Sequence, residues 1–311
     1  MLILKNIDKF LALLNDGYEF IDVSKGGLPP KEYFFPPEET TFTFETKDGL
    51  VSTPPSPRPF VLYGLSIRDL AAIRYLDEIM STPERDFYYF RRRNRALLVG
   101  VAGERFDVPP GGDIILAPLS AGAFRIQAVT VKGEKVIKKY LPRLKKSEDA
   151  RADLPESETM AELRRLLMDA ELIKDAVEWS WKGYPRLWEK LSAECMGCGI
   201  CTYVCPLCHC FSMEDSIDLS GELARRCRKW DACTLPGFAK LGGGGGDLHP
   251  GLKERYYNWF FHKFVRAYTE FGRAQCVACG RCQRECPARI DIESVLLDIV
   301  ARYEKERKRQ R

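Results

Sequence analysis

Cys195-Met-Gly-Cys198-Gly-Ile-Cys201-Thr-Tyr-Val-Cys205-Pro206 is the stretch that decides the organisation of this chain, and Cys276-Val-Ala-Cys279-Gly-Arg-Cys282-Gln-Arg-Glu-Cys286-Pro287 repeats its spacing. Both read C-x2-C-x2-C-x3-C-P, the run that holds cubane [4Fe–4S] clusters. Three thiolates at this spacing can wrap one face of a cluster where the backbone turns tightly. The fourth cysteine, followed by proline, points away toward a second cluster. The repeat therefore predicts two [4Fe–4S] clusters.

The two runs are expected to exchange their last ligand. In two-cluster ferredoxins the fourth cysteine of each run binds the other cluster. The same exchange here assigns one cluster to Cys195, Cys198, Cys201 and Cys286, and the other to Cys276, Cys279, Cys282 and Cys205. The two runs must then lie close together in space, although residues 206–275 separate them in the chain.

Two other roles for the cysteines carry less weight. Structural zinc takes four ligands, usually as two C-x2-C pairs, which does not suit two complete runs that each end in Cys-Pro. A disulfide framework is not expected in a large chain without secretory features. A zinc-stabilised binding module stays an alternative, and a colourless, zinc-loaded protein would reveal it.

The composition describes an ordinary globular protein of two domains. The chain has 311 residues, 45% of them hydrophobic and 30% charged, which is enough for two separate cores. A net charge of only +4 provides no overall drive toward nucleic acid, and no nucleic-acid partner is expected. All 12 cysteines lie between Cys195 and Cys286. We therefore expect a cysteine-free domain over 1–145, a linker and helices over 146–190, and a cluster-bearing domain over 191–311.

The chain is expected to work in the cytoplasm. Lys5, Asp8 and Lys9 interrupt the N-terminal residues, which lack the apolar core of a signal peptide. No stretch approaches the ~18 uncharged apolar residues of a membrane span. With so many thiols, this indicates a reducing compartment and no direct membrane insertion. Docking to a membrane through another subunit stays open.

The first 145 residues predict a mixed α/β domain. Hydrophobic periodicity indicates helices over 6–14 and from Ser66 to Asp77, and strands over 40–46, 60–64, 96–101 and 114–116. A hairpin is expected from Phe124 to Val136 with its turn at Lys132-Gly133. No phosphate-binding glycine motif follows any of these strands.

The rest of the chain predicts helices around the two cysteine runs. Helical patterning covers 160–181, 185–193, 253–271 and 291–303, with a long helical insertion between the runs. The helix over 253–271 carries an aromatic stripe that is expected to be core; an electron-conducting wire is the alternative. Its members are Tyr257, Phe260, Phe261, Phe264, Tyr268 and Phe271. The fold class is thus α+β, a mixed α/β domain followed by an α-helical ferredoxin-like domain with two [4Fe–4S] clusters.

No nucleophile or general-base constellation is present, so no catalytic residues are assigned and the chain alone is expected to catalyse nothing. Arg281 and Arg284 within the second run, and Arg289 just after it, would favour the reduced, more negative form of the cluster there. The cluster on the Cys276 side is therefore predicted to have the higher reduction potential.

Further segments carry a family resemblance. These are Cys205-Pro-Leu-Cys208-His-Cys210-Phe, Arg225-Arg-Cys-Arg-Lys-Trp-Asp-Ala-Cys233, the Gly-rich loop 241–247, and upstream 28–36 and 60–77. With the final cysteine run they resemble the iron–sulfur β subunit of cytoplasmic sulfhydrogenases, and equally the iron–sulfur electron-transfer protein of anaerobic sulfite reductases. The resemblance implies an electron-transfer subunit of an anaerobic oxidoreductase. It also implies two kinds of partner: a reductase subunit that binds flavin and NAD(P), and a catalytic subunit that is a hydrogenase or reduces sulfite.

The cysteines depart from this family at two places. Relatives carry further cysteines where this chain reads Leu65-Ser-Ile-Arg-Asp and Val101-Ala-Gly-Glu-Arg-Phe-Asp, so an N-terminal cluster is expected to be absent. Cys208, Cys210, Cys227 and Cys233 remain after eight ligands are assigned, and all but Cys227 fall at family-like positions. We expect them to pack or to donate hydrogen bonds near the clusters, since free cysteine is often a small buried hydrophobe. An additional metal or redox site at these four cysteines is the alternative.

Overall fold

The chain forms two compact units. The computed structural model describes residues 2–24, 26–103, 111–140, 145–146 and 160–310. Unit 1 comprises residues 1–157 and 216–226, and unit 2 comprises 158–215 and 227–311. The domain boundaries expected near 145 and 190 stay predictions, and most of the expected linker lies outside the described residues.

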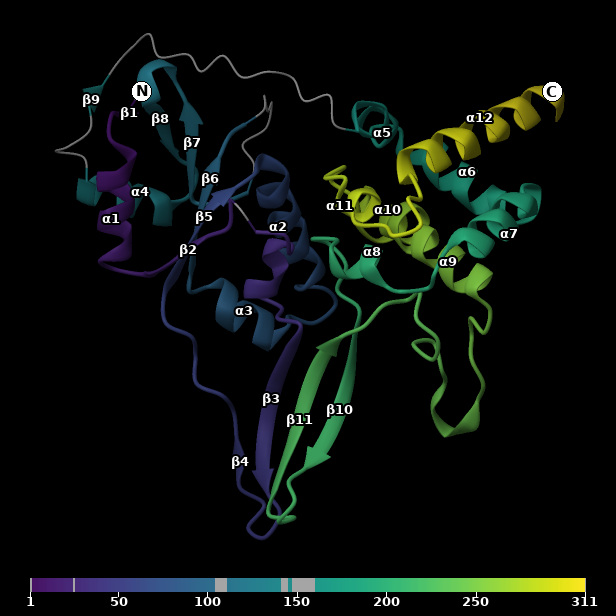
Figure 1. Cartoon of the computed structure of the whole chain (residues 1–311), viewed down its shortest axis with the longest axis horizontal. Helices are drawn as coiled ribbons and strands as arrows, with labels where there is room; N and C mark the ends of the chain where they lie inside the picture. The colour runs from purple at the N-terminus through teal and green to yellow at the C-terminus, as the bar shows by residue number, and fades with distance from the viewer. Residues whose placement is uncertain (1, 25, 104–110, 141–144, 147–159, 311) are drawn as a thin grey trace. The chain divides into compact units, whose positions relative to one another are not determined.

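Unit 1 is built on a seven-stranded sheet of order β2-β5-β6-β7-β8-β1-β9. β2, β5, β6 and β7 are mutually parallel, whereas β7–β8, β8–β1 and β1–β9 are antiparallel pairs. The strands are β1 Leu2–Leu4, β2 Glu19–Asp22, β5 Phe60–Leu65, β6 Ala96–Val101, β7 Ile114–Pro118, β8 Phe124–Ala128 and β9 Lys145–Lys146. The helices of this unit are α1 Ile7–Asn15, α2 Ile67–Ile79, α3 Phe87–Arg93 and α4 Val131–Tyr140, with 3-10 turns at Pro30–Tyr33 and Ser120–Gly122 (Figure 1).

Both faces of this sheet are covered. Residues that alternate along a strand point to opposite faces. Val61, Leu97 and Val99 join α1 and α4 in one apolar cluster. Phe60, next to Val61 on the same strand, points to the opposite face, where its ring stacks on Phe34 with 6.2 Å between the ring centroids. The sheet is therefore a buried central layer, as its nearly continuous apolar strands require.

The expected hairpin over 124–136 is wrong in its second half. β8 ends at Ala128, and α4 follows it. Thr130 caps this helix, since its hydroxyl accepts from the amide of Gly133 at 3.2 Å. Val136 is buried together with Ile137 against the sheet residues, whereas Val131 at the start of the helix is exposed. Lys132-Gly133 therefore begins a helix and does not form a hairpin turn.

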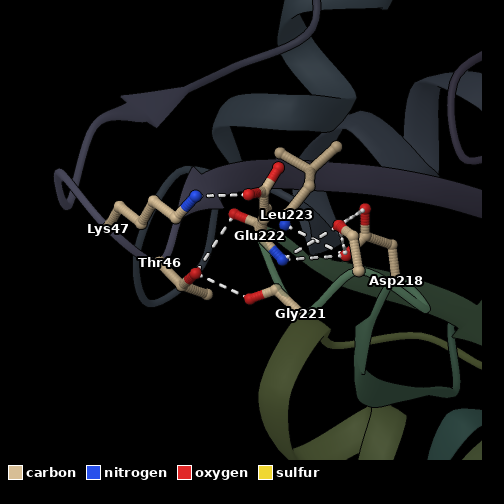
Figure 2. Close-up of polar contacts among 7 residues, drawn as sticks. Thr46, Lys47, Asp218, Gly221, Glu222 and Leu223 are labelled. Carbon is tan, nitrogen blue, oxygen red and sulfur yellow. Dashed lines mark hydrogen bonds and ion pairs between the residues drawn. The ribbon is translucent and has the colours of Figure 1, made fainter.

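A second sheet has the order β10-β11-β3-β4, from strands β3 Glu38–Glu45, β4 Val51–Ser52, β10 Phe211–Ile217 and β11 Leu223–Trp230. Within unit 1, the turn between β3 and β4 meets the turn between β10 and β11. Figure 2 shows this meeting: the Thr46 hydroxyl donates to the carbonyl oxygen of Gly221 at 2.7 Å, and Lys47 pairs with Glu222. Asp218 accepts from the amides of Glu222 and Leu223, which closes its turn.

Unit 2 is mainly helical. Its helices are α5 Ala161–Leu166, α6 Ala170–Gly183, α7 Pro185–Glu194, α8 Ile200–Tyr203, α9 Leu252–Phe261, α10 Ala267–Phe271, α11 Arg281–Arg284 and α12 Ile292–Gln310; a 3-10 turn spans Gly242–Gly244. Between α9 and α10 the chain makes a π-helical turn over His262–Arg266. α6 packs against α12, and α7 packs against α9 (Figure 1).

The aromatic stripe on α9 and α10 is core, as expected. Phe260, Phe264 and Tyr268 are buried in one cluster with residues of α6, α7 and α12. Trp188 on α7 lies edge-on to Phe260 at 5.2 Å, and its indole N–H donates to Ser180 on α6 at 3.2 Å. Six of the cysteines pack against the same cluster; they are Cys195, Cys201, Cys210, Cys276, Cys282 and Cys286.

The long insertion between the cysteine runs is not wholly helical, which corrects the predicted helical domain. β10 and β11 occupy its first part, and helix begins only at Leu252. Gly221 has φ of 73° at the turn between these strands, a conformation that favours glycine. Phe211 and Met213 alternate with polar residues along β10, a strand period that the sequence analysis overlooked.

Across the described part of the chain, no helix is both long and apolar enough to cross a bilayer.

Asp113 joins the sheet of unit 1 to α4. Its buried carboxylate accepts from the amide of Leu98 at 2.9 Å and from the hydroxyl of Thr130 at 2.5 Å. We predict that Asp113→Ala lowers the free energy of unfolding by about 2 kcal/mol, because it removes a charged acceptor and leaves the Leu98 amide buried without it. Urea unfolding followed by far-UV circular dichroism measures this change. Asp16→Ala, an exposed position, is the matched control, and equal midpoints for the two variants would refute the prediction.

Candidate iron–sulfur centre

The two cysteine runs fold into loops of the same backbone conformation. Gly197 and Ala278 occupy equivalent positions and have φ of 63° and 50°. Gly199 and Gly280 are also equivalent, with φ of 77° and 72°, and each precedes a four-residue helix, α8 or α11. A positive φ is expected of glycine and strained in alanine, so the loop geometry is imposed on Ala278 by its surroundings.

The two loops lie together. α8 and α11 contact each other, as the ribbon also shows (Figure 1). Each loop turns a backbone amide toward the sulfur of its first cysteine, with Gly197 N to Cys195 Sγ and Ala278 N to Cys276 Sγ both at 3.4 Å. Leu207 N donates to Cys205 Sγ at the same distance. Amide hydrogen bonds to sulfur of this kind stabilise negative charge on a ligand thiolate.

One cavity between the loops is lined by the first predicted ligand set. Cys195, Cys198 and Cys201 come from the first run and Cys286 from the second, and Cys282 joins them. Cys198 is exposed, whereas the other three are partly buried. Apolar walls complete the cavity; they include Ile200, Tyr256, Trp259, Pro287 and Ile290.

A second cavity is lined by the other predicted set. Cys276, Cys279 and Cys282 come from the second run, and Cys205 reaches in from the first. Cys205 is buried. The two cavities share Cys282 and Ile292 on their walls, so they are neighbours. Each run therefore sends its fourth cysteine to the cavity of the other run, which is the arrangement that ligand exchange requires.

The chemistry of these thiols fits a cationic iron centre. Burial, followed by the charge of Cys195, raises the pKa of Cys201 to about 12. Burial likewise raises the pKa of Cys276 to about 11, against the opposing effects of Lys263 and of the Ala278 amide. Several buried thiolates side by side are unfavourable without a cation, and iron supplies that compensation. Without iron these thiols are protonated at neutral pH.

The four remaining cysteines lie close to the predicted ligands or in the core. The Cys208 thiol hydrogen-bonds to Cys205, which together with burial raises the pKa of Cys208 well above its ordinary value. A hydrogen bond to Cys210, with burial, does the same for Cys233. Cys227 is buried on β11. For Cys208, Cys210 and Cys233 this arrangement agrees with packing and sulfur hydrogen bonding near the predicted ligands.

A single metal ion would need a different arrangement. Within residues 2–24, 26–103, 111–140, 145–146 and 160–310, no three or more His, Cys, Asp and Glu side chains are grouped so as to hold one ion. A zinc site requires such a group. A cubane cluster brings its own sulfide and spaces its iron atoms apart, so its four thiolates need not converge on one point.

The sequence analysis missed Lys263. Its side chain is buried at 3% exposure on the wall of the second cavity, and Nζ donates to Cys205 Sγ at 3.1 Å. Burial by itself lowers the pKa of Lys263, but the charges of Cys205, Cys208 and Cys276 hold this pKa well above its ordinary value. The sequence does contain one signal for this role: Lys263 is a lone lysine in the aromatic stretch Trp259–Val265, which is expected to be buried. Because lysine is almost never fully buried unless it is paired, a partner for its ammonium was to be expected.

The described residues of the two segments where the resemblance implied N-terminal cysteines form ordinary secondary structure. Ser66 caps α2 by accepting from the amide of Asp69 at 3.1 Å. Gly100 at the end of β6 packs directly against Leu70. Of the second segment, 101–103 are described and 104–107 lie outside the described residues.

Burial and the raised pKa values together predict an order of thiol reactivity in the cluster-free protein. Because the thiolate is the reacting form, Cys201 and Cys276 should be alkylated by iodoacetamide at pH 8 far more slowly than the exposed Cys198. Their rates should rise about tenfold per pH unit below the pKa. Mass spectrometry of the alkylated peptides measures this order. In urea the difference should vanish, and equal rates in the folded protein would refute the prediction.

Comparison with known proteins agrees with this geometry. Residues 194–290 match the family described as a 4Fe–4S dicluster domain. Over 293 residues, 90% of this chain and 85% of the relative, the chain is 29% identical to sulfhydrogenase 2 subunit beta of Pyrococcus furiosus. No solved structure matches the chain. The predicted resemblance to sulfhydrogenase β subunits is thereby confirmed. The chain is an iron–sulfur protein that carries a 4Fe–4S dicluster domain and resembles a sulfhydrogenase β subunit along nearly its whole length.

Proposed function

We propose that this chain is an electron-transfer subunit of a multisubunit cytoplasmic oxidoreductase, which relays single electrons through two [4Fe–4S] clusters. Cys195, Cys198, Cys201 and Cys286 hold one cluster, and Cys276, Cys279, Cys282 and Cys205 hold the other. The observation that carries the proposal is the pair of neighbouring cavities, each lined by the four cysteines of one set. When bound, such a cluster accepts and releases one electron at a time.

The surrounding residues suit this task. Apolar side chains such as Trp259 and Ile292 shield the more buried sulfurs from water, which limits the reorganisation that accompanies a change of charge. The amides of Gly197, Leu207 and Ala278 are already directed at sulfur. The rigid helical core behind the loops keeps these groups in place. The chain therefore binds and tunes the redox groups and leaves substrate chemistry to other subunits.

The two ends of the relay are assigned to partner subunits. The first cavity includes the exposed Cys198 and lies beside Met196, whose side chain is also exposed, so electrons enter or leave there. One partner is a reductase subunit that binds flavin and NAD(P). The other is a catalytic subunit such as a hydrogenase or a sulfur or sulfite reductase. The relative's name supports a sulfhydrogenase-like assembly.

Anaerobic purification of the native complex tests the partner assignment. We predict that a flavoprotein and a catalytic oxidoreductase subunit co-purify with this chain in fixed stoichiometry. Mass spectrometry of the complex identifies them. A chain that purifies alone, with no flavoprotein associated at any salt concentration, would contradict the assignment.

The ligand exchange has its own test. Two [4Fe–4S] clusters contain eight irons, so each of Cys286→Ser and Cys205→Ser should lower the iron content of the chain from about eight toward four. Cys286→Ser should remove the same EPR signal as Cys195→Ser, and Cys205→Ser the same signal as Cys276→Ser. If Cys286→Ser instead removes the signal lost in Cys276→Ser, the exchange is wrong.

Cys227→Ser is the matched control and should leave eight irons in place, since Cys227 belongs to neither set. Twelve irons in the wild-type chain would establish the alternative third site at Cys208, Cys210, Cys227 and Cys233. A zinc-loaded, colourless chain would overturn the proposed function as a whole.

A further inference from the structure

Lys263 occupies an unusual place in the helix that crosses unit 2. It lies in the π-helical turn His262–Arg266, where three consecutive residues, Lys263, Phe264 and Val265, are all buried. A regular α-helix turns each successive residue by about 100°, so it cannot direct three in a row into one core. The wider turn does so here, and π-turns are frequently found at functional sites.

The Lys263 ammonium joins the two cysteine runs. Nζ donates to Cys205 Sγ at 3.1 Å and to the carbonyl oxygen of Gln275 at 3.2 Å, next to Cys276. It also lies 5.2 Å from the centre of the Trp259 ring, a favourable position for a cation. The Gln275 amide N–H returns a bond to the carbonyl oxygen of Lys263 at 2.8 Å. The ammonium is thus held from several sides.

No carboxylate is among the partners described for this ammonium, whose contacts are a thiol sulfur, a carbonyl oxygen and an aromatic face. Of the arginines expected to act on the same cavity, Arg284 pairs with Glu285 at 2.8 Å and its side chain is 61% exposed, so solvent and the carboxylate screen its charge. On the first cavity, Arg255 lies near Cys195, but it donates to the carbonyl oxygens of Thr234, His249 and Pro250 and not to a sulfur.

We propose that Lys263 is the positioning residue that sets the difference in reduction potential between the two clusters. It does so by raising the potential of the cluster held by Cys205, Cys276, Cys279 and Cys282. This inference rests on the proposed function. Reduction adds one negative charge and no atoms, so a buried cation bonded to one ligand sulfur favours the reduced state of that cluster most. The charge of Lys263 also acts on Cys201 on the first cavity, but Lys263 donates no hydrogen bond to it. The reduction potential of the first cluster should therefore depend less on Lys263.

The asymmetry gives the relay a direction. Electrons that enter at the exposed Cys198 side move toward the cluster beside Lys263, where they are held more strongly. Replacing the ammonium by a neutral side chain removes this gradient without touching a ligand.

Redox titration of the purified full chain, followed by EPR, tests the inference. The signal of the Cys276-side cluster is first identified by its loss in Cys279→Ser. In Lys263→Met the reduction equilibrium constant of this cluster should fall at least tenfold, a shift of about 59 mV to lower potential for one electron. The other cluster should shift by clearly less. Lys182→Met, which removes an exposed lysine on α6, should shift neither potential.

Two further variants separate charge from packing. Lys263→Gln keeps a hydrogen-bond donor but not the charge, so the reduction potential of the Cys276-side cluster should fall in this variant as well. Lys263→Arg keeps the charge, so the reduction equilibrium constant of that cluster should stay within about threefold of the wild-type value. If the wild type, Lys263→Met and Lys263→Gln all retain eight irons and show the same potential for the Cys276-side cluster, the inference about Lys263 is wrong. The proposed electron relay would not be affected by that result. A wild-type chain without eight irons would instead overturn the proposed function.

A measurement on the wild type does not depend on how the variants assemble. Protein labelled with ¹⁵N at the lysine side chains should show a ¹⁵N coupling in pulsed EPR of the reduced Cys276-side cluster, because Nζ lies within hydrogen-bond distance of a ligand sulfur. The coupling should disappear in Lys263→Gln. If the labelled wild type shows no such coupling, the contact is absent and the inference fails.

Discussion

The packing of cysteine sulfurs against an apolar helical core is the constraint on which unit 2 depends. Burial raises the pKa of thiols such as Cys201 and Cys276, so their ionised forms are unfavourable in this core unless positive charge accompanies them. Iron is one source of that charge, and the ammonium of Lys263 is another. Backbone amides directed at sulfur add partial positive charge. The unit is therefore organised to receive negative charge, which is what reduction of a cluster delivers.

The repeated loop conformation shows how the chain prepares two equivalent sites. The matched left-handed residues, Gly197 with Ala278 and Gly199 with Gly280, turn each run back on itself before a short helix. Ala278 adopts this conformation without the freedom of glycine, so the surrounding packing must determine the loop. The two sites nevertheless differ in their surroundings. One includes the exposed Cys198, and the other is lined by the buried Cys205 and Lys263. Equivalent ligands in unequal surroundings are what a directed relay needs.

Unit 1 uses a different principle. Its central strands are apolar on both faces, and helices of the same unit cover both, so the sheet is stable without cysteine or metal. Gly100, near the end of β6, lets α2 approach closely, as its contact with Leu70 shows. The segment where the family resemblance implied further cysteines begins a helix that Ser66 caps.

The cysteine spacing, a local property, was enough to predict two ligand sets, because each C-x2-C-x2-C loop is formed by neighbouring residues. Helical periodicity likewise predicted the aromatic core face and the last helix. The expected hairpin with its turn at Lys132-Gly133 was wrong, because the cap at Thr130 and the burial of Val136 and Ile137 against the sheet select a helix there. The hairpin β10–β11 was overlooked because its exposed strands carry only a weak alternation.

The sequence by itself thus predicted which cysteines act as ligands and which kind of cluster they would hold. Only the tertiary structure decided what surrounds them. Lys263 stands 58 residues from Cys205 in the chain, and a π-helical turn, which no local pattern announced, directs its ammonium onto that sulfur. The ligands can be predicted from spacing because they are near one another in the sequence. The electrostatic environment of a cluster cannot, because it depends on the charges and dipoles of all the residues that folding brings close to it.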